Sequence, residues 1–216
     1  MAKRVLSGFL GVLILPDVYA TQAAAQLTDT KGVRHAEYRV KPEGVHITLY
    51  QARNFKQMPV SVAEKLVAKL NEFLVSNRAG ELLLYMLDIK PYQDNEQYLF
   101  WNIDRTKKHG RLMDAHGMSL ALSAWVDPSA EDEASLERRI AEMSEKRQQR
   151  ERKLCTNKRV FGHTLVGEDY LPHITLAANT KGFKKFKPTQ EALISSASRV
   201  VLARMGEWGK IEEILI

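Results

Sequence analysis

The tetrapeptide His-Ile-Thr-Leu occurs twice in this chain, at residues 46–49 and 173–176. An imidazole with an unperturbed pKa near ~6.5 can accept or donate a proton at neutral pH. A threonine hydroxyl can donate a hydrogen bond to an oxygen on which negative charge develops. Because alternate side chains of an extended strand share a face, each copy presents its His and Thr together and anchors itself through Ile and Leu.

Two such strands side by side would gather His46, Thr48, His173 and Thr175 around one small cavity. One imidazole would then act as general base and the other as general acid, each role typically contributing about 10²–10⁴ in rate. Either assignment of the two roles fits the sequence. The alternative interpretation is a pair of ordinary strands that each carry an incidental histidine.

Other residues are weaker candidates for the same site. Tyr50 follows Thr48 on the expected strand face, so it would line the pocket or pack at its rim, and Tyr170 would line it from the second motif. Trp101 and Phe161 are able to stack on a base, although aromatic side chains more often belong to the core. The remaining histidines are expected to be solvated in loops, in turns or at a helix start: His35, His109, His116 and His163.

The composition is that of an ordinary globular protein of 216 residues with a formal net charge of +6, which favours an anionic partner. The lysines at 181, 184, 185 and 187 are candidates for holding an RNA backbone, with a plain solvated loop as the alternative. The single Cys155 excludes an intrachain disulfide and a CxxC metal site, and no ligand spacing indicates a metal.

The N-terminal segment has two interpretations. Residues 1–20 resemble an export signal, with basic residues, an apolar run and a small-residue cleavage site. Alternatively, residues 9–15 form a buried strand that Pro16 ends, and Asp17 caps a helix through Thr28. The arrangement of the whole chain favours the strand, and the apolar run is too short to span a bilayer.

Periodicity and turn residues predict the remaining elements. Strands are expected at 36–40, 82–89, 98–103, 198–204 and 211–216, besides the two His-Ile-Thr-Leu strands. Helices are expected at 61–76, with a capping box at Ser61 and Glu64, and at 114–126, 131–153 and 189–195. The helix over 131–153 begins acidic and ends basic, which stabilises a solvated helix but also suits an RNA-binding face.

The duplicated motif resembles that of the 2H phosphoesterase superfamily, in its branch of 2′-5′ RNA ligase-like and cyclic phosphodiesterase proteins. Three further stretches are similar to that family: Leu15-Pro16-Asp17, Lys41-Pro42-Glu43-Gly44-Val45 and Tyr170-Leu171-Pro172. The long charged segment between the motifs is a departure from compact relatives. The resemblance implies an α+β fold of two pseudo-symmetric lobes, each an antiparallel sheet with helices outside, and a cleft between them.

The resemblance also implies a single bilobal domain over residues 1–216, with a first lobe at about 30–96, a second at about 160–216 and a helical insert at about 114–153. His46 and His173 would be catalytic, and Thr48 and Thr175 would bind the substrate phosphate. The expected activity is a metal-independent phosphodiesterase on a 2′,3′-cyclic phosphate or a 2′-5′ linkage, at an RNA end or in a small nucleotide. No cofactor is implied, and we expect a cytoplasmic monomer, or an exported protein if residues 1–20 are cleaved. The alternative function is an inactive RNA- or nucleotide-binding module of the same fold.

Overall fold

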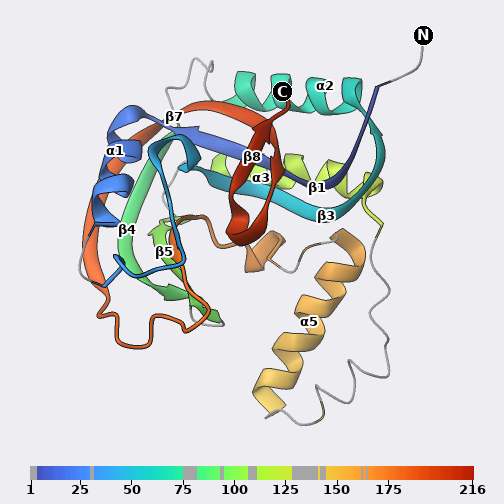
Figure 1. The fold of residues 1–216 in the computed structure, drawn as a ribbon. Helices are drawn as coiled ribbons and strands as arrows, with labels where there is room; N and C mark the ends of the chain where they lie inside the picture. The colour runs from blue at the N-terminus through green and yellow to red at the C-terminus, as the bar shows by residue number, and fades with distance from the viewer. Residues whose placement is uncertain are drawn as a thin grey trace.

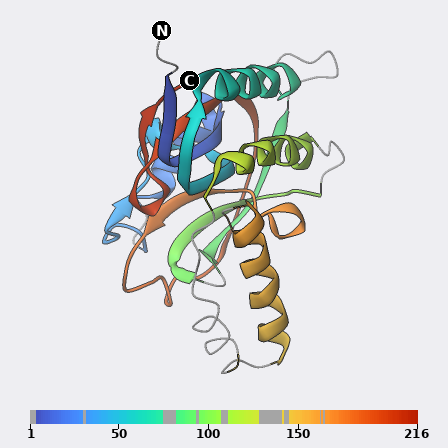
Figure 2. The ribbon, with the colours of Figure 1, turned by 90° about the vertical axis from the view of Figure 1, so that its right-hand side faces the viewer.

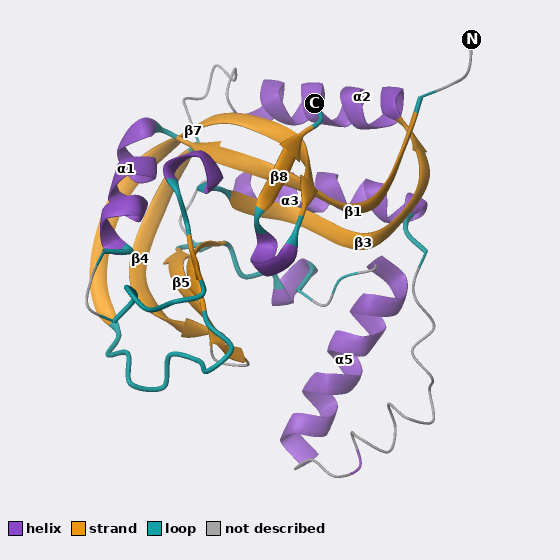
Figure 3. Cartoon of the chain, viewed as in Figure 1, coloured by secondary structure: helices purple, strands orange, loops and turns teal. Residues whose placement is uncertain are grey.

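The computed structural model of the chain describes residues 4–29, 32–74, 82–92, 95–106, 111–127, 141, 145–161, 163 and 165–216. It shows an α+β fold built on a large antiparallel sheet (Figures 1 and 3). The strands are β1 (Val5–Pro16), β2 (Tyr38–Arg39), β3 (Ile47–Pro59), β4 (Leu83–Tyr92), β5 (Asn95–Ile103), β6 (His173–Ala178), β7 (Thr189–Met205) and β8 (Ile211–Ile214). The α-helices are α1 (Val18–Leu27), α2 (Val60–Leu74), α3 (Arg111–Ser119) and α5 (Glu145–Phe161). The 3₁₀ helices are η1 (Pro42–Gly44), η2 (Leu120–Trp125), η3 (Gly167–Asp169) and η4 (Glu207–Gly209).

The long strand β7 joins two halves of this sheet. The strand order is β2-β6-β5-β4-β7-β1-β3, with β8 also paired to β7. The first part of β7, from Thr189 to Ser196, pairs with β4, whereas the part from Ala197 to Arg204 pairs with β1. Each half holds one His-Ile-Thr-Leu copy, in β3 and in β6, so the molecule has the two lobes that the resemblance implied.

The lobes do not follow the expected segments 30–96 and 160–216. Strand β3 pairs with β1 and β7 in one half, but β4, which follows β3 in sequence, lies in the other half. At the C-terminus, β6 and β8 are likewise in different halves. Each half therefore contains strands from both the earlier and the later part of the sequence, and β7 belongs to both halves.

The strand interpretation of residues 9–15 agrees with the structure. In β1, the side chains of Leu10, Val12 and Ile14 are fully buried, and the strand lies between β3 and β7. Asp17 caps α1 as expected, since one of its carboxylate oxygens accepts a hydrogen bond from the Ala20 N–H at 3.0 Å. Its other oxygen accepts from the Ser196 N–H at 2.9 Å, which fixes the start of α1 to β7.

Two of the expected local features are wrong. Residues 189–195 form the first part of β7 and not a helix, because pairing with β4 outweighs their local helical pattern. Helix α2 begins at Val60, directly after β3, so Ser61 lies inside its first turn and does not precede it as a capping residue. The helical segment at 114–126 is present as α3 and η2.

The helices cover the sheet unevenly. Helix α1 contacts β6 and β7, while α2 and α3 pack together and lie over β3 and β7 (Figures 1 and 2). Helix α5 projects away from the sheet and contacts η2. It continues to Phe161, beyond the expected end at residue 153, and most of residues 131–144 lie outside the described part of the chain. No helix among the described residues is long and apolar enough to cross a membrane.

Candidate functional site

The two His-Ile-Thr-Leu copies approach each other although they lie on different strands of the sheet. Strand β3 is at one end of the strand order and β6 is next to the other end, yet the sheet curves so that β3 contacts β6. A hydrogen bond joins the first motif to the segment that leads into the second, because the Tyr170 hydroxyl donates to the Thr48 carbonyl at 2.9 Å. The expected convergence of the two motifs is therefore present.

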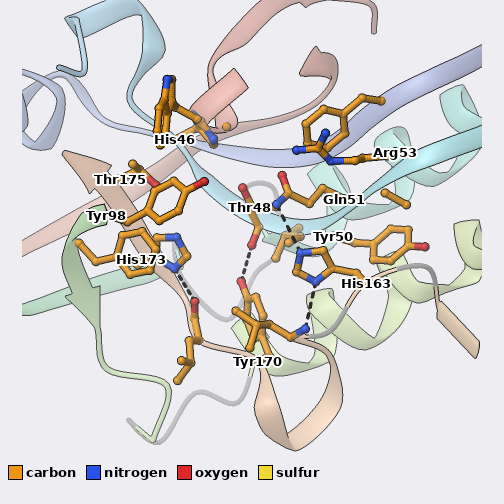
Figure 4. Close-up of a pocket in the computed structure, with 18 of the residues that line it drawn as sticks. His46, Thr48, Tyr50, Gln51, Arg53, Tyr98, His163, Tyr170, His173 and Thr175 are labelled. Carbon is orange, nitrogen blue, oxygen red and sulfur yellow. Dashed lines mark hydrogen bonds between the residues drawn. The ribbon is translucent and has the colours of Figure 1, made fainter. Parts of the chain in front are cut away.

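His46, Thr48, His173 and Thr175 all line one pocket of about 350 Å³ (Figure 4). Both predicted tyrosines, Tyr50 and Tyr170, also line it. Isoleucine and leucine of each motif point into the core, as the alternation predicts: Ile47, Leu49, Ile174 and Leu176 are each at most 1% exposed. The pocket thus receives the polar face of both strands.

The two histidines are held in the same way. Nδ1 of His46 lies 2.7 Å from the Gly44 carbonyl oxygen, and Nδ1 of His173 lies 2.7 Å from the Leu171 carbonyl oxygen. Because a carbonyl oxygen only accepts, Nδ1 of each ring carries a proton. In the neutral ring Nε2 is then unprotonated. Each imidazole is able to accept a proton at Nε2 or, once protonated, to donate it there.

Burial lowers the pKa of both rings. For His46 the loss of hydration outweighs the hydrogen bond to Gly44, which acts in the opposite direction. For His173 burial lowers the pKa to about 4, and the positive charges that His46 and His163 would carry lower it further. The ring of His173 also stacks on Phe100, with a centroid separation of 3.6 Å. Both imidazoles are therefore mostly neutral at pH 7 in the empty pocket, and one of them must gain a proton to act as the general acid.

Each motif has a β-bulge at its last residue, the leucine. On β1, Leu13 pairs with Thr48 and the next residue, Val12, pairs with Tyr50, so Leu49 is an extra residue in β3. On β5, Phe100 pairs with Thr175 and Leu99 pairs with Ala177, so Leu176 is an extra residue in β6. Bulges re-aim the side chains that follow them and are frequent beside active sites.

The bulge at Leu49 explains two lining residues that the sequence analysis missed. Strict alternation from Thr48 would point Gln51 and Arg53 away from the pocket, but both line it (Figure 4). Tyr50 lies largely on the buried side, where its ring packs edge-on against Phe55 and its hydroxyl donates to the Phe161 carbonyl. A single sequence carries no clear signal for this bulge.

His116 and Tyr170 form the wall behind the two motifs. The expectation that His116 is solvated is wrong, because its side chain is buried inside the fold. Its Nδ1 lies 2.6 Å from the Leu49 carbonyl oxygen, and its Nε2 accepts a hydrogen bond from the Gly167 N–H at 2.9 Å. Its ring stacks on Tyr170 at 4.0 Å between centroids. This histidine thus connects the first motif to the segment that leads into the second.

His163 also belongs to the pocket and not to a solvated loop. Its Nδ1 accepts a hydrogen bond from the Leu165 N–H at 3.1 Å, and its Nε2 lies 3.4 Å from the Gln51 amide nitrogen. Burial lowers its pKa to about 4. The proximity of its loop to β3 is a tertiary feature, so sequence spacing alone gives no indication of it.

The remaining candidates lie elsewhere or have structural roles. Trp101 is buried in the core, with its indole N–H donating to the Glu191 carbonyl at 2.7 Å. Phe161 packs against the core at the end of α5. His35 is exposed in the loop before β2, and the lysines at 181, 184, 185 and 187 do not line this pocket. His109 lies outside the described residues.

Tyr98 and Trp208 also line the pocket, and their rings meet edge to face at 5.7 Å between centroids. Trp208 adopts a left-handed backbone conformation with φ of 60° in η4, which places a bulky residue in a turn where glycine is usual. Within the described part of the chain, no three histidine, cysteine or carboxylate side chains cluster as metal ligands would.

The fold is shared with two solved structures, in agreement with the resemblance. Among solved structures, the chain is similar to E. coli LigT in complex with ATP, at 12% identity and a TM-score of 0.56, covering 98% of this chain and 96% of that one. It is equally similar to a protein described as a phosphoesterase, at 13% identity and a TM-score of 0.56, covering 98% and 97% of the two chains. Comparison with protein-family models finds no match, and comparison with curated proteins also finds none.

Proposed function

We propose that the protein is a metal-independent phosphodiesterase that acts on 2′,3′-cyclic phosphates or 2′-5′ linkages, at RNA ends or in small nucleotides. The observation that carries this proposal is the matched pair of imidazoles. His46 and His173 line one pocket, and each has its Nδ1 proton fixed on a carbonyl oxygen two residues earlier. Paired histidines with available Nε2 atoms supply a base and an acid without further groups.

For a 2′,3′-cyclic phosphate, the reaction adds water across one ring P–O bond. The Nε2 of one neutral imidazole accepts the proton of the attacking water as its oxygen bonds to phosphorus. The other imidazole, protonated, donates its Nε2 proton to the departing ribose oxygen, so the product is a phosphate monoester with a free hydroxyl beside it. Thr48 and Thr175 donate hydrogen bonds to the non-bridging oxygens, where negative charge increases in the transition state.

The fold likeness to LigT and to a phosphoesterase supports this class of function. The pocket also suits an anionic ligand, because the charged residues that line it are Arg53 and Lys158. We place the enzyme in the cytoplasm as a monomer. Export would require removal of residues 1–20, and with them β1, which lies between β3 and β7. A mass measurement of the mature protein distinguishes the two locations.

The test is hydrolysis of uridine 2′,3′-cyclic phosphate in EDTA, with the 2′ and 3′ products resolved. We expect turnover by the wild-type protein and a loss of at least about 10²-fold in kcat for His46→Ala and for His173→Ala. His35→Ala removes an exposed histidine outside the pocket and is the matched control, with unchanged turnover. Full activity in either pocket variant would rule out the mechanism.

The second candidate is a binding module of the same fold. It is favoured if the wild-type protein binds a cyclic nucleotide tightly but releases no product from cyclic nucleotides, 2′-5′ dinucleotides or RNA termini. The presence of both histidines and both threonines in one pocket argues for catalysis instead.

A further inference from the structure

The pocket continues beyond the two histidines along β3. On that side it is lined by Gln51, Arg53 and His163, none of which the reaction described above uses (Figure 4). We propose that Arg53, His163 and Gln51 form a site for a second phosphate of the substrate, next to the phosphate that reacts. This inference rests on the proposed function and specifies its substrate: a nucleotide with a further 5′ phosphate, as at the end of an RNA chain.

The charge of the lining supports an anion at this position. Arg53 and Lys158 are basic, and no aspartate or glutamate is among the described residues that line the pocket. The Arg53 guanidinium lies 5.1 Å from the centre of the Phe9 ring, which also lines the pocket. When a guanidinium stacks its face on an aromatic ring, the N–H groups along its edge stay available. Phosphate is a preferred partner for two of these N–H groups at once.

The tautomer of His163 suits a hydrogen-bond donor to a ligand and not a third general base. Its Nδ1 accepts the Leu165 N–H, so the neutral ring carries its proton on Nε2. His46 and His173 have the opposite arrangement, with the proton on Nδ1. Nε2 of His163 is therefore able to donate to an oxygen without competing for the proton of the attacking water.

Gln51 completes the site through the same ring. Its amide lies 3.4 Å from Nε2 of His163, and its Oε1 is buried without a hydrogen-bond partner in the described part of the chain. The NH₂ group of Gln51 therefore lies beside the Nε2–H of His163, and the two donors can bind oxygens of the same phosphate.

The spacing along β3 separates this site from the reacting phosphate. A strand advances about 3.3 Å per residue, so Gln51 lies up to roughly 10 Å of strand beyond Thr48, and Arg53 lies further. The oxygens of one phosphate do not extend so far. We therefore assign Arg53 and Gln51 to a part of the substrate beyond the phosphate that Thr48 would hold (Figure 4).

The test compares uridine 2′,3′-cyclic phosphate with and without a 5′-phosphate, at one fixed ionic strength. We expect the wild-type protein to favour the 5′-phosphorylated substrate by about tenfold or more in kcat/KM, the size of one charged hydrogen bond. Arg53→Gln and His163→Leu should each reduce this ratio toward one. Arg199→Gln, the same change at an exposed residue outside the pocket, should leave it unchanged.

The ratio is informative even if a variant is partly unfolded, because both substrates meet the same folded fraction. A wild-type ratio near one, or a wild-type ratio retained in both Arg53→Gln and His163→Leu, would overturn the second phosphate site while leaving the proposed function intact. If the wild-type protein hydrolyses neither substrate, the proposed function fails. The ratio of dissociation constants for the same two compounds, measured by calorimetry, then decides on the site by the same criterion.

Discussion

At the scale of single residues, the two histidines share one hydrogen bond. In each case Nδ1 donates to the carbonyl oxygen two residues earlier, at 2.7 Å. The sequence predicted that both rings would share a pocket, since the motif is short and its alternation is regular. It did not predict the tautomer, which depends on the turn geometry that precedes each motif.

The lowered pKa values make a prediction for the pH dependence of catalysis. The active free enzyme holds one proton on the pair, so kcat/KM is highest midway between the two apparent pKa values of the pair. Since burial lowers the pKa of His46 and lowers that of His173 to about 4, this maximum should fall below pH 6.5. A bound phosphate anion raises both pKa values, so kcat should peak at a higher pH than kcat/KM.

Full pH–rate profiles with uridine 2′,3′-cyclic phosphate measure both maxima. A kcat/KM maximum above pH 7 would contradict the paired-histidine assignment. So would coincident maxima for kcat and kcat/KM, because they would show that the bound anion does not affect the titrating groups.

At the scale of elements, the bulges at Leu49 and Leu176 decide which side chains reach the pocket. Strict alternation correctly predicts His46, Thr48, His173 and Thr175, all of which precede the bulges. It fails immediately afterwards, where Tyr50 turns largely to the buried side and Gln51 and Arg53 line the pocket. The extra residue is set by pairing with β1 and β5, and this pairing is a tertiary property that strand periodicity does not contain.

Tyr170 provides the test of how these elements hold the site together. Its hydroxyl donates to the Thr48 carbonyl at 2.9 Å, and burial raises its pKa, which keeps the donor proton in place. Tyr170→Phe leaves that carbonyl without this donor, so we expect a loss of about 1 kcal/mol in the free energy of unfolding. Because Thr48 would be held less firmly, kcat should also fall severalfold.

Urea unfolding and steady-state kinetics measure the two effects. Tyr19→Phe is the matched control, since Tyr19 is 73% exposed on α1, and it should change neither quantity. If Tyr170→Phe is as stable and as active as the wild-type protein, the hydrogen bond from Tyr170 to the Thr48 carbonyl has no functional role.

At the scale of the whole molecule, β7 is the element that differs most from the one predicted from the sequence. Residues 189–195 were expected to be helical, yet they extend β7 into the second half of the sheet. The two contiguous lobes were expected from the family resemblance, and they differ from the structure because β7 pairs with strands of both halves. The first strand was predicted correctly from the arrangement of the whole chain, while Pro16 and Asp17 marked where the strand ends and the helix begins.

The concentration of buried histidines between the two halves predicts how global stability depends on pH. Burial lowers the pKa of four histidines in the folded state, namely His46, His116, His163 and His173. In the unfolded chain these rings titrate near ~6.5, so between that pH and the lower folded values the unfolded state binds more protons. Their contribution to stability is therefore fully present above pH 6.5 and is lost as the pH falls toward about 4, the folded pKa of His163 and His173.

Urea unfolding at pH 7.5, 6.0 and 5.0 measures this effect before most carboxylates titrate. We expect the free energy of unfolding to decrease across this range, with each ring adding up to about 1.4 kcal/mol per pH unit below pH 6.5. His163→Leu should flatten the slope because it removes one of these rings, whereas His35→Ala, at an exposed position, should retain it. A free energy of unfolding that stays constant from pH 7.5 to 5.0 would show that the four rings are solvated. It would also contradict the burial that lowers the pKa values of His46 and His173.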